Sequence, residues 1–221
     1  MRIFSRFALL SSLCMILLMG YAFQTQGATI LYDNYSSGFV ANPGNTILGG
    51  SNYQSIGQTF SPSQTANLSD IDAPFGYVSG TNIVILNLTT DNNGNPGTLL
   101  ESWTLQSLPA LSTNYSSQTM VSTINPLLTA GNTYWLIASP YDSSTWAVWN
   151  PTNNPNYGYY ENSNSINPQW ILVNDVHSSA FAVYGTPITP SQNTPEPGVL
   201  ATLMSMGMAG GGIFLRRLRK A

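Results

Sequence analysis

Short runs of apolar residues, separated by clusters of Asn, Gly and Pro, recur from residue 28 to about residue 186. Many of these runs are rich in β-branched and aromatic residues, which favour strands, and none shows a long helical repeat. We expect strands at 29–33, 55–60, 67–73, 82–89, 98–105, 117–124, 132–139, 145–150, 169–174 and 180–185. The pattern predicts an all-β domain, an antiparallel β-sandwich that is jelly-roll-like.

Basic residues are confined to the two ends of the 221-residue chain. None lies between Phe7 and Leu215, whereas all nine acidic residues do, so this interval has a formal charge of −9 with His177 neutral. Without cations it cannot neutralise phosphate groups, which argues against nucleic-acid binding and phosphoryl transfer. The single cysteine, Cys14, lies near the N-terminus, so the predicted domain has no disulfide, thiolate ligand or cysteine nucleophile.

The N-terminus has the pattern of a secretory signal peptide. Two arginines precede the apolar run 7–19, and polar residues follow it. The run is too short for a stop-transfer helix. We assign residues 1–27 to the signal peptide. Cleavage after Gly27 or Ala28 fits the first strand best, and cleavage after Ala22 is the alternative.

The C-terminus predicts a transmembrane helix. Residues 198–215 carry no charge, and at ~1.5 Å per helical residue they approach the ~30 Å thickness of a bilayer core. A basic tail follows at 216–221, and such tails stay in the cytoplasm, so the preceding domain faces outward. The linker 187–194 connects the domain to this region. The cations of the tail are Arg216, Arg217, Arg219 and Lys220.

Pro195, Glu196 and Pro197 precede the predicted span. Together with the span and the tail they resemble the PEP-CTERM sorting signal of Gram-negative bacteria, over residues 195–221. The resemblance implies Sec export, a transient inner-membrane intermediate, recognition of the three residues by a membrane-embedded exosortase, and delivery to the cell surface or extracellular matrix. Carriers of this signal often occur in species that make extracellular polysaccharide, which names polysaccharide as a candidate partner.

The predicted domain, 28–186, resembles the choice-of-anchor R family, which is found upstream of such sorting signals. The resemblance implies surface display and gives no activity. The segments that carry it are 31–34 (LYDN), 55–60 (SIGQTF), the turn from Asp91 to Leu100, and 130–136 (AGNTYWL).

We expect no catalytic residue, cofactor or metal in this domain. His177 is the only histidine, and we interpret it as a surface-turn residue because no nucleophile elbow accompanies it. Asp70 and Asp72 share one face of a predicted strand, and Asp91 and Glu101 flank a predicted hairpin, so each pair is a candidate for glycoside hydrolysis. With so few carboxylates, a solvated surface explains both pairs better.

The turn after Asp91 begins like a calcium loop, with oxygen ligands also at Asn93 and Asn95. Pro96 stands where such a loop needs glycine, and Ser102 where it needs an acid. We therefore expect a hairpin turn capped by Asx side chains. Calcium binding elsewhere in the domain stays open, because the domain has no lysine or arginine to balance its acids.

Aromatic residues are dense between residues 141 and 170. Rings on an exposed surface stack on sugars, although packing in the core accounts for some of them. The run 157–160 is expected to form an exposed loop. The candidate glycan-binding residues are Trp146, Trp149, Tyr157, Tyr159 and Tyr160.

These features predict an exported, exosortase-processed surface or matrix protein with a structural or adhesive role and no enzymatic activity. The alternative is a carbohydrate-binding module or a glycan-active protein of the matrix.

Overall fold

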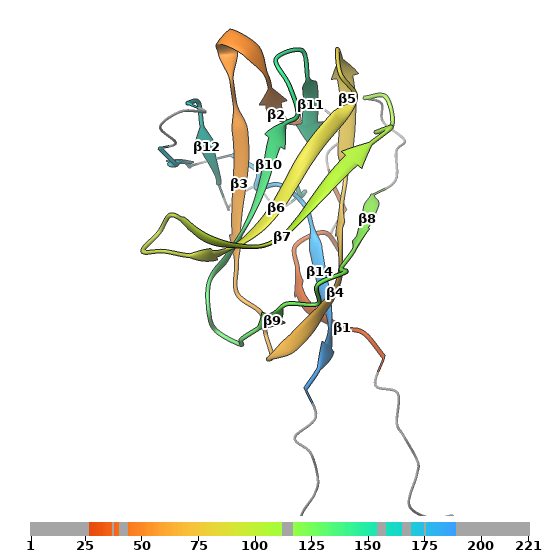
Figure 1. Ribbon diagram of the computed structural model, residues 1–221, viewed down its shortest axis with the longest axis vertical. Coiled ribbons are helices and arrows are strands. Elements are labelled where there is room, and N and C mark those ends of the chain that lie inside the picture. The colour runs from red at the N-terminus through yellow and green to blue at the C-terminus, as the bar shows by residue number, and fades with distance from the viewer. Residues whose placement is uncertain are drawn as a thin grey trace, which may run out of the picture. The chain divides into compact units, whose positions relative to one another are not determined.

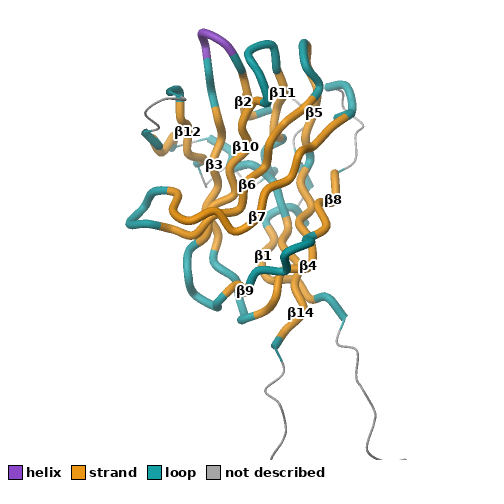
Figure 2. Tube along the Cα trace, in the orientation of Figure 1, coloured by secondary structure: helices purple, strands orange, loops and turns teal. Residues whose placement is uncertain are grey.

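A computed structural model describes residues 27–36, 38–39, 44–111, 117–153, 158–164, 169–174 and 176–188. In these residues the chain is all-β, and its one helical element is a single 3₁₀ turn, η1 (Gly50–Asn52). Figures 1 and 2 show the strands gathered into antiparallel sheets that face each other. The predicted all-β class is therefore confirmed, in a sandwich-like form.

Three sheets make up the domain, and every strand pair in them is antiparallel. Sheet 1 has the order β1 (Thr29–Asp33), β14 (Ala182–Pro187), β4 (Ala66–Ala73) and β8 (Gln118–Val121), with β9 (Leu127–Leu128) also paired to β4. Sheet 2 has the order β13 (Ile171–Val173), β12 (Tyr159–Asn162), β3 (Ser55–Phe60), β10 (Tyr134–Pro140), β6 (Ile83–Asp91) and β7 (Pro96–Gln106). Sheet 3 has the order β2 (Asn45–Leu48), β11 (Trp146–Trp149) and β5 (Phe75–Ser79).

The hydrophobic core lies between sheets 1 and 2 and extends under sheet 3. Strand β6 shows how alternation builds it, because Val84, Leu86 and Leu88 are fully buried while the residues between them are only half-buried. Across the core, the Phe181 ring lies 5.8 Å from the Phe60 ring of β3. The core contains residues of all three sheets, so they form one unit.

One lateral edge of the domain is joined by side chains rather than by strand pairing. Strand β7 ends sheet 2 and β8 ends sheet 1 at this edge. The indole Nε1 of Trp103 on β7 donates a 2.9 Å hydrogen bond to the Val121 carbonyl on β8. The Glu101 carboxylate on the same strand accepts hydrogen bonds from the segment that follows β8.

The opposite lateral edge brings β1 of sheet 1 near β3, β12 and β13 of sheet 2. The Tyr32 ring on β1 is stacked on Phe181 at 4.8 Å and lies 5.7 Å from the Phe60 ring. Strand β12 pairs with β3 only from Ser55 to Gly57, so Gln58 and Thr59 lie beyond the end of that pairing. This edge is therefore less completely covered by strands than the other.

All ten predicted strands are present, with bounds that agree within three residues. Four strands were not predicted, namely β2, β5, β9 and β12. The largest difference concerns β12, because the run 157–160 was expected to be a loop. Tyr159 and Tyr160 instead form strand pairs with β13 and are half-buried. That expectation of an exposed loop is wrong for these two residues, and Tyr157 lies outside the described residues.

Candidate functional site

A pocket of about 290 Å³ lies at the lateral edge where β1 approaches β3, β12 and β13. We call it the edge pocket. Its described lining residues come from three regions that are distant in the sequence, namely residue 32, residues 58–59 and residues 158–178, and none of them carries a formal charge. They are Tyr32, Gln58, Thr59, Gly158, Tyr160, Leu172, Asn174 and Ser178.

Gln58 is the unusual residue of the edge pocket. Strand alternation places it on the inward face of β3 between Ile56 and Phe60, which both belong to the hydrophobic core. Its side chain is 5 % exposed, and its amide nitrogen Nε2 has no hydrogen-bond partner in the part of the chain that the structure describes. Leaving a buried donor unsatisfied costs about 1–3 kcal/mol, so this side chain destabilises the folded state.

Gln58 was not predicted as a site residue from the sequence. A signal was present, because a long polar side chain interrupts the apolar period-2 pattern of Ile56 and Phe60. That pattern shows an inward polar residue, but it does not show whether a partner meets it. The missing partner becomes visible only when β1 and β12 are placed around β3.

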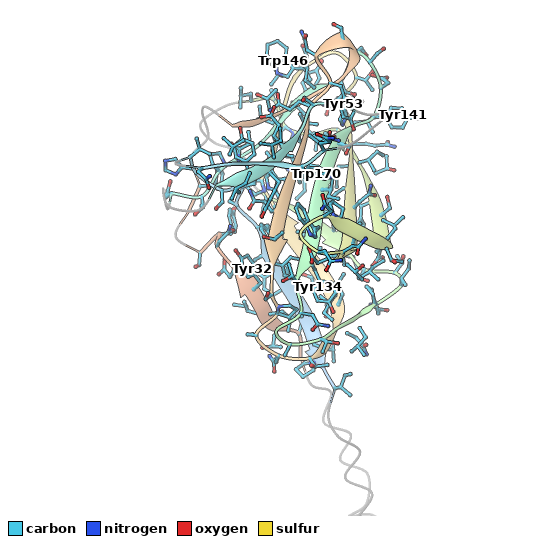
Figure 3. The ribbon with its side chains drawn as sticks, turned by 90° about the vertical axis from the view of Figure 1, so that its left-hand side faces the viewer. Tyr32, Tyr53, Tyr134, Tyr141, Trp146 and Trp170 are labelled. Atoms are coloured by element: carbon cyan, nitrogen blue, oxygen red, sulfur yellow. The ribbon has the colours of Figure 1, made fainter. Side chains whose placement is uncertain are left out.

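The tyrosines of the edge pocket are held by other aromatic rings. Tyr160 lies 4.5 Å from the Trp135 ring, and Trp170 lies 5.8 Å from the same ring. Gly57 permits this arrangement, since a Cβ atom there would approach Trp170 Cζ3 to 2.9 Å. Figure 3 shows Trp170 and Tyr32 along the face of the domain that carries this edge. The rings around the pocket are therefore fixed in position before any ligand arrives.

The predicted glycan-binding aromatics do not form one surface. Trp149 is fully buried and its Nε1 donates a 2.8 Å hydrogen bond to the Ala180 carbonyl, so the prediction that it contacts a ligand is wrong. Trp146 is 44 % exposed and lies at one end of the domain, away from the edge pocket (Figure 3). Tyr159 packs against the core, and burial followed by the charge of Glu161 raises its pKa. Of the four that are described, only Tyr160 lines the pocket.

The predicted carboxylate pairs have structural partners. Burial, and then the charge of Asp72, raises the pKa of Asp70, which agrees with the prediction that both lie on one face of β4. Asp72 accepts a 2.5 Å hydrogen bond from the Thr119 hydroxyl of the neighbouring strand. Asp91 accepts one from Trp135 Nε1 at 2.7 Å, while Glu101 faces the other way, toward the segment after β8. None of the four lines the edge pocket.

The turn after Asp91 is a hairpin, as expected. Asn93 and Gly94 have φ angles of 54° and 79°, and backbone hydrogen bonds join Asn92 to Asn95 in both directions. Two central residues with positive φ make the two-residue turn that fits the twist of paired strands. The Asp91 carboxylate accepts a hydrogen bond from the Gly94 amide, which is an Asx cap.

His177 links its own loop to the loop that contains Thr152 by a hydrogen bond. Its Nδ1 lies 2.7 Å from the Thr152 carbonyl oxygen, which can only accept, so Nδ1 carries the proton. In a catalytic triad an aspartate accepts the hydrogen bond from this nitrogen. In this protein the Thr152 carbonyl accepts it instead. Among the described residues, no group of three or more His, Asp or Glu side chains is arranged to hold a metal ion.

The sorting residues lie outside the part of the chain that the structure describes. This applies to Pro195, Glu196 and Pro197, to the predicted span 198–215, and to the basic tail 216–221. Within the described segments, no helix has the length and apolar character needed to cross a membrane.

Comparisons with protein families, curated proteins and solved structures gave no match.

Proposed function

We propose that this chain is an exported, exosortase-processed protein of the bacterial cell surface or extracellular matrix, with a structural or adhesive role and no enzymatic activity. The observation that carries the proposal is the separation of charge, because every Lys and Arg lies within residues 1–6 or 216–221. Those two segments are the ones that export and sorting would remove. The Pro195–Pro197 motif and the uncharged run 198–215 support the same route.

The hydrogen bonds of the fold explain how the domain can be stable without Lys or Arg side chains to pair with its carboxylates. Several of its described carboxylates accept hydrogen bonds from neutral donors, as Glu101 does from Ser122 and Thr123 and Asp91 does from Trp135. The first strand begins at Thr29 and the last ends at Pro187, and these strands are paired neighbours. We also propose that the domain is a jelly-roll-like sandwich. Strands that are neighbours in a sheet but not consecutive in the sequence support this fold, as in β1–β14–β4 and β3–β10–β6.

The test is to measure the intact mass of the protein recovered from cells and from the medium. Intact mass is the suitable readout because trypsin has no site between Arg6 and Arg216. We expect a form that begins after residue 22, 27 or 28 and ends near Pro195–Pro197. Recovery of the uncut chain from the cytosol would overturn the proposal.

The second candidate is a carbohydrate-binding module. It is favoured by the edge pocket, which combines fixed tyrosine rings with uncharged polar side chains. Binding through this pocket is compatible with an adhesive role at the surface. No carboxylate is among the described lining residues, so their chemistry supports binding rather than glycoside hydrolysis.

A further inference from the structure

We infer that the edge pocket binds an uncharged, hydroxyl-rich ligand about the size of one sugar ring, and that the Gln58 amide donates a hydrogen bond to it. The inference rests on the second candidate function and gives it a site and a ligand class. It does not depend on whether the chain is exported or cut.

The composition of the pocket selects an uncharged ligand. Its described polar lining residues are Gln58, Asn174, Thr59, Ser178, Tyr32 and Tyr160, which carry amides and hydroxyls. An anionic ligand would find no cation, since residues 7–215 contain no Lys or Arg. A cationic ligand would find no carboxylate among the described lining residues. Sugar hydroxyls both donate and accept hydrogen bonds, which matches amides and hydroxyls.

The size of the pocket limits the ligand. A volume of about 290 Å³ is at the lower end of the ~300–1,000 Å³ that is usual for small-molecule pockets. It suits one ring rather than an extended chain. Tyr32 is held by Phe181 and Tyr160 by Trp135, so the pocket loses little freedom when it is filled.

Gln58 gives the inference its strongest support. A leucine at this position would continue the core of Ile56 and Phe60 without a polar penalty, yet the chain carries an amide whose Nε2 lacks a partner in the described structure. Asn82, a half-buried amide in this fold, shows the usual behaviour, because its Nδ2 donates to the Leu108 carbonyl at 2.9 Å. Nε2 is itself buried, so the amide must turn it into the pocket, where a ligand hydroxyl would supply the acceptor that Gln58 lacks.

The experiment is ligand-observed saturation-transfer NMR on the full-length chain, in a detergent without a sugar headgroup. The probes are glucose, galactose, mannose, fucose, xylose and N-acetylglucosamine, with glucuronate and glucosamine as charged counterparts. We expect at least one uncharged sugar to bind and the charged counterparts to bind more weakly. The dissociation constant of the bound sugar should rise at least about fivefold in Gln58→Leu, as the loss of one hydrogen bond implies.

The matched control is Gln106→Leu, the same change at an exposed position near the end of β7. It should leave binding unchanged. A stability measurement separates a ligand contact from a structural role. Gln58→Leu should raise or preserve the urea midpoint of the sugar-free protein, because it removes an unsatisfied polar group. Weaker sugar binding together with an undiminished urea midpoint supports the inference.

Three results would overturn it. One is that none of the six uncharged sugars binds, which would leave water as the partner of Gln58. Another is that glucuronate or glucosamine binds at least as tightly as the uncharged sugars. The third is that Gln58→Leu lowers the urea midpoint or leaves sugar binding unchanged. The masses of the processed ends do not depend on any of these results, so a failure here leaves the export proposal standing.

Discussion

Glu101 on β7 accepts a 2.5 Å hydrogen bond from the Ser122 hydroxyl, which lies just after β8 in the facing sheet. The same carboxylate accepts backbone hydrogen bonds from Thr123 at 2.6 Å and Ile124 at 3.2 Å. In the described residues β7 is paired only with β6, and β8 only with β4. A buried carboxylate, 3 % exposed, therefore joins the two sheets without any cation.

Replacing this carboxylate by an amide should destabilise the domain. Glu101→Gln keeps the size of the side chain but turns an NH₂ group toward donors that need an acceptor. Hydrogen bonds to charged groups are worth about 1.5–3 kcal/mol, so we expect the free energy of unfolding to fall by about 2 kcal/mol at pH 7. Urea unfolding with an unchanged slope would measure this loss.

The effect of Glu101→Gln should depend on pH. Burial alone would raise the pKa of Glu101, but the hydrogen bonds from Ser122, Thr123 and Ile124 outweigh it and hold the pKa below its ordinary 4.5. The stabilisation is then present above pH 4.5 and is lost as the pH falls through the lowered pKa. The control is Glu161→Gln on β12, which is half-buried and should change the stability by less than about 0.5 kcal/mol. Equal losses for the two variants would contradict the role given to Glu101.

Asp142 organises an exposed turn by the same means. The hydroxyl of Thr81, and then Ser144 and Thr145, donate hydrogen bonds to its carboxylate and lower its pKa to about 2. We expect NMR of the carboxyl carbon to show this low value. Thr81→Val should move the pKa up toward 3.8, while Thr119→Val, which removes a bond to Asp72 instead, should not. A midpoint near 3.8 in the unsubstituted protein would contradict the hydrogen-bonded turn.

For Asp70 we expect the opposite dependence of the free energy of unfolding on pH. Its pKa is raised by burial and by the charge of Asp72, so the ionised form costs stability once the pH exceeds the raised pKa. Asp70→Asn should therefore raise the free energy of unfolding at pH 7, by less than about 1 kcal/mol because the site is near the surface. The gain should vanish below pH 3.8, where both forms are neutral. Asp72→Asn removes the same repulsion but weakens the bond from Thr119, so its gain should be smaller. A loss of stability for Asp70→Asn at pH 7 would rule out this explanation.

The sequence predicted strands best where their side chains alternate. In β6 the burial of Val84, Leu86 and Leu88 follows directly from the pattern of the run. Strand β12 was missed because the evidence for it is not local. Tyr159 and Tyr160 stand between prolines and look like loop residues, and only contacts with Trp135 and with strands β3 and β13 make them a strand.

The candidate site was predictable only in part. Composition had already indicated that a ligand of the domain would meet no Lys or Arg, and the dense aromatic residues between 141 and 170 had indicated rings. The edge pocket itself requires segments from residue 32 to residue 178 to converge, which no local pattern shows. Trp149 and Trp146 illustrate the same limit, because two tryptophans on one short strand differ from 0 % to 44 % exposure.

Because Trp149 is buried and Trp146 is exposed, we expect alanine substitutions at the two positions to differ in their effect on stability. Trp149 is packed between Phe75 at 5.1 Å and Phe181 at 5.9 Å, so Trp149→Ala should lower the free energy of unfolding by about 3–5 kcal/mol. Trp146→Ala removes a side chain that is largely in solvent and should cost less than about 1 kcal/mol. Thermal unfolding followed by near-ultraviolet circular dichroism would separate them. If sugar binding falls in Trp149→Ala, it should fall only in proportion to the unfolded fraction, since this ring cannot reach a ligand. Lost binding in a fully folded Trp149→Ala protein would instead place the ligand against sheet 3 and away from the edge pocket.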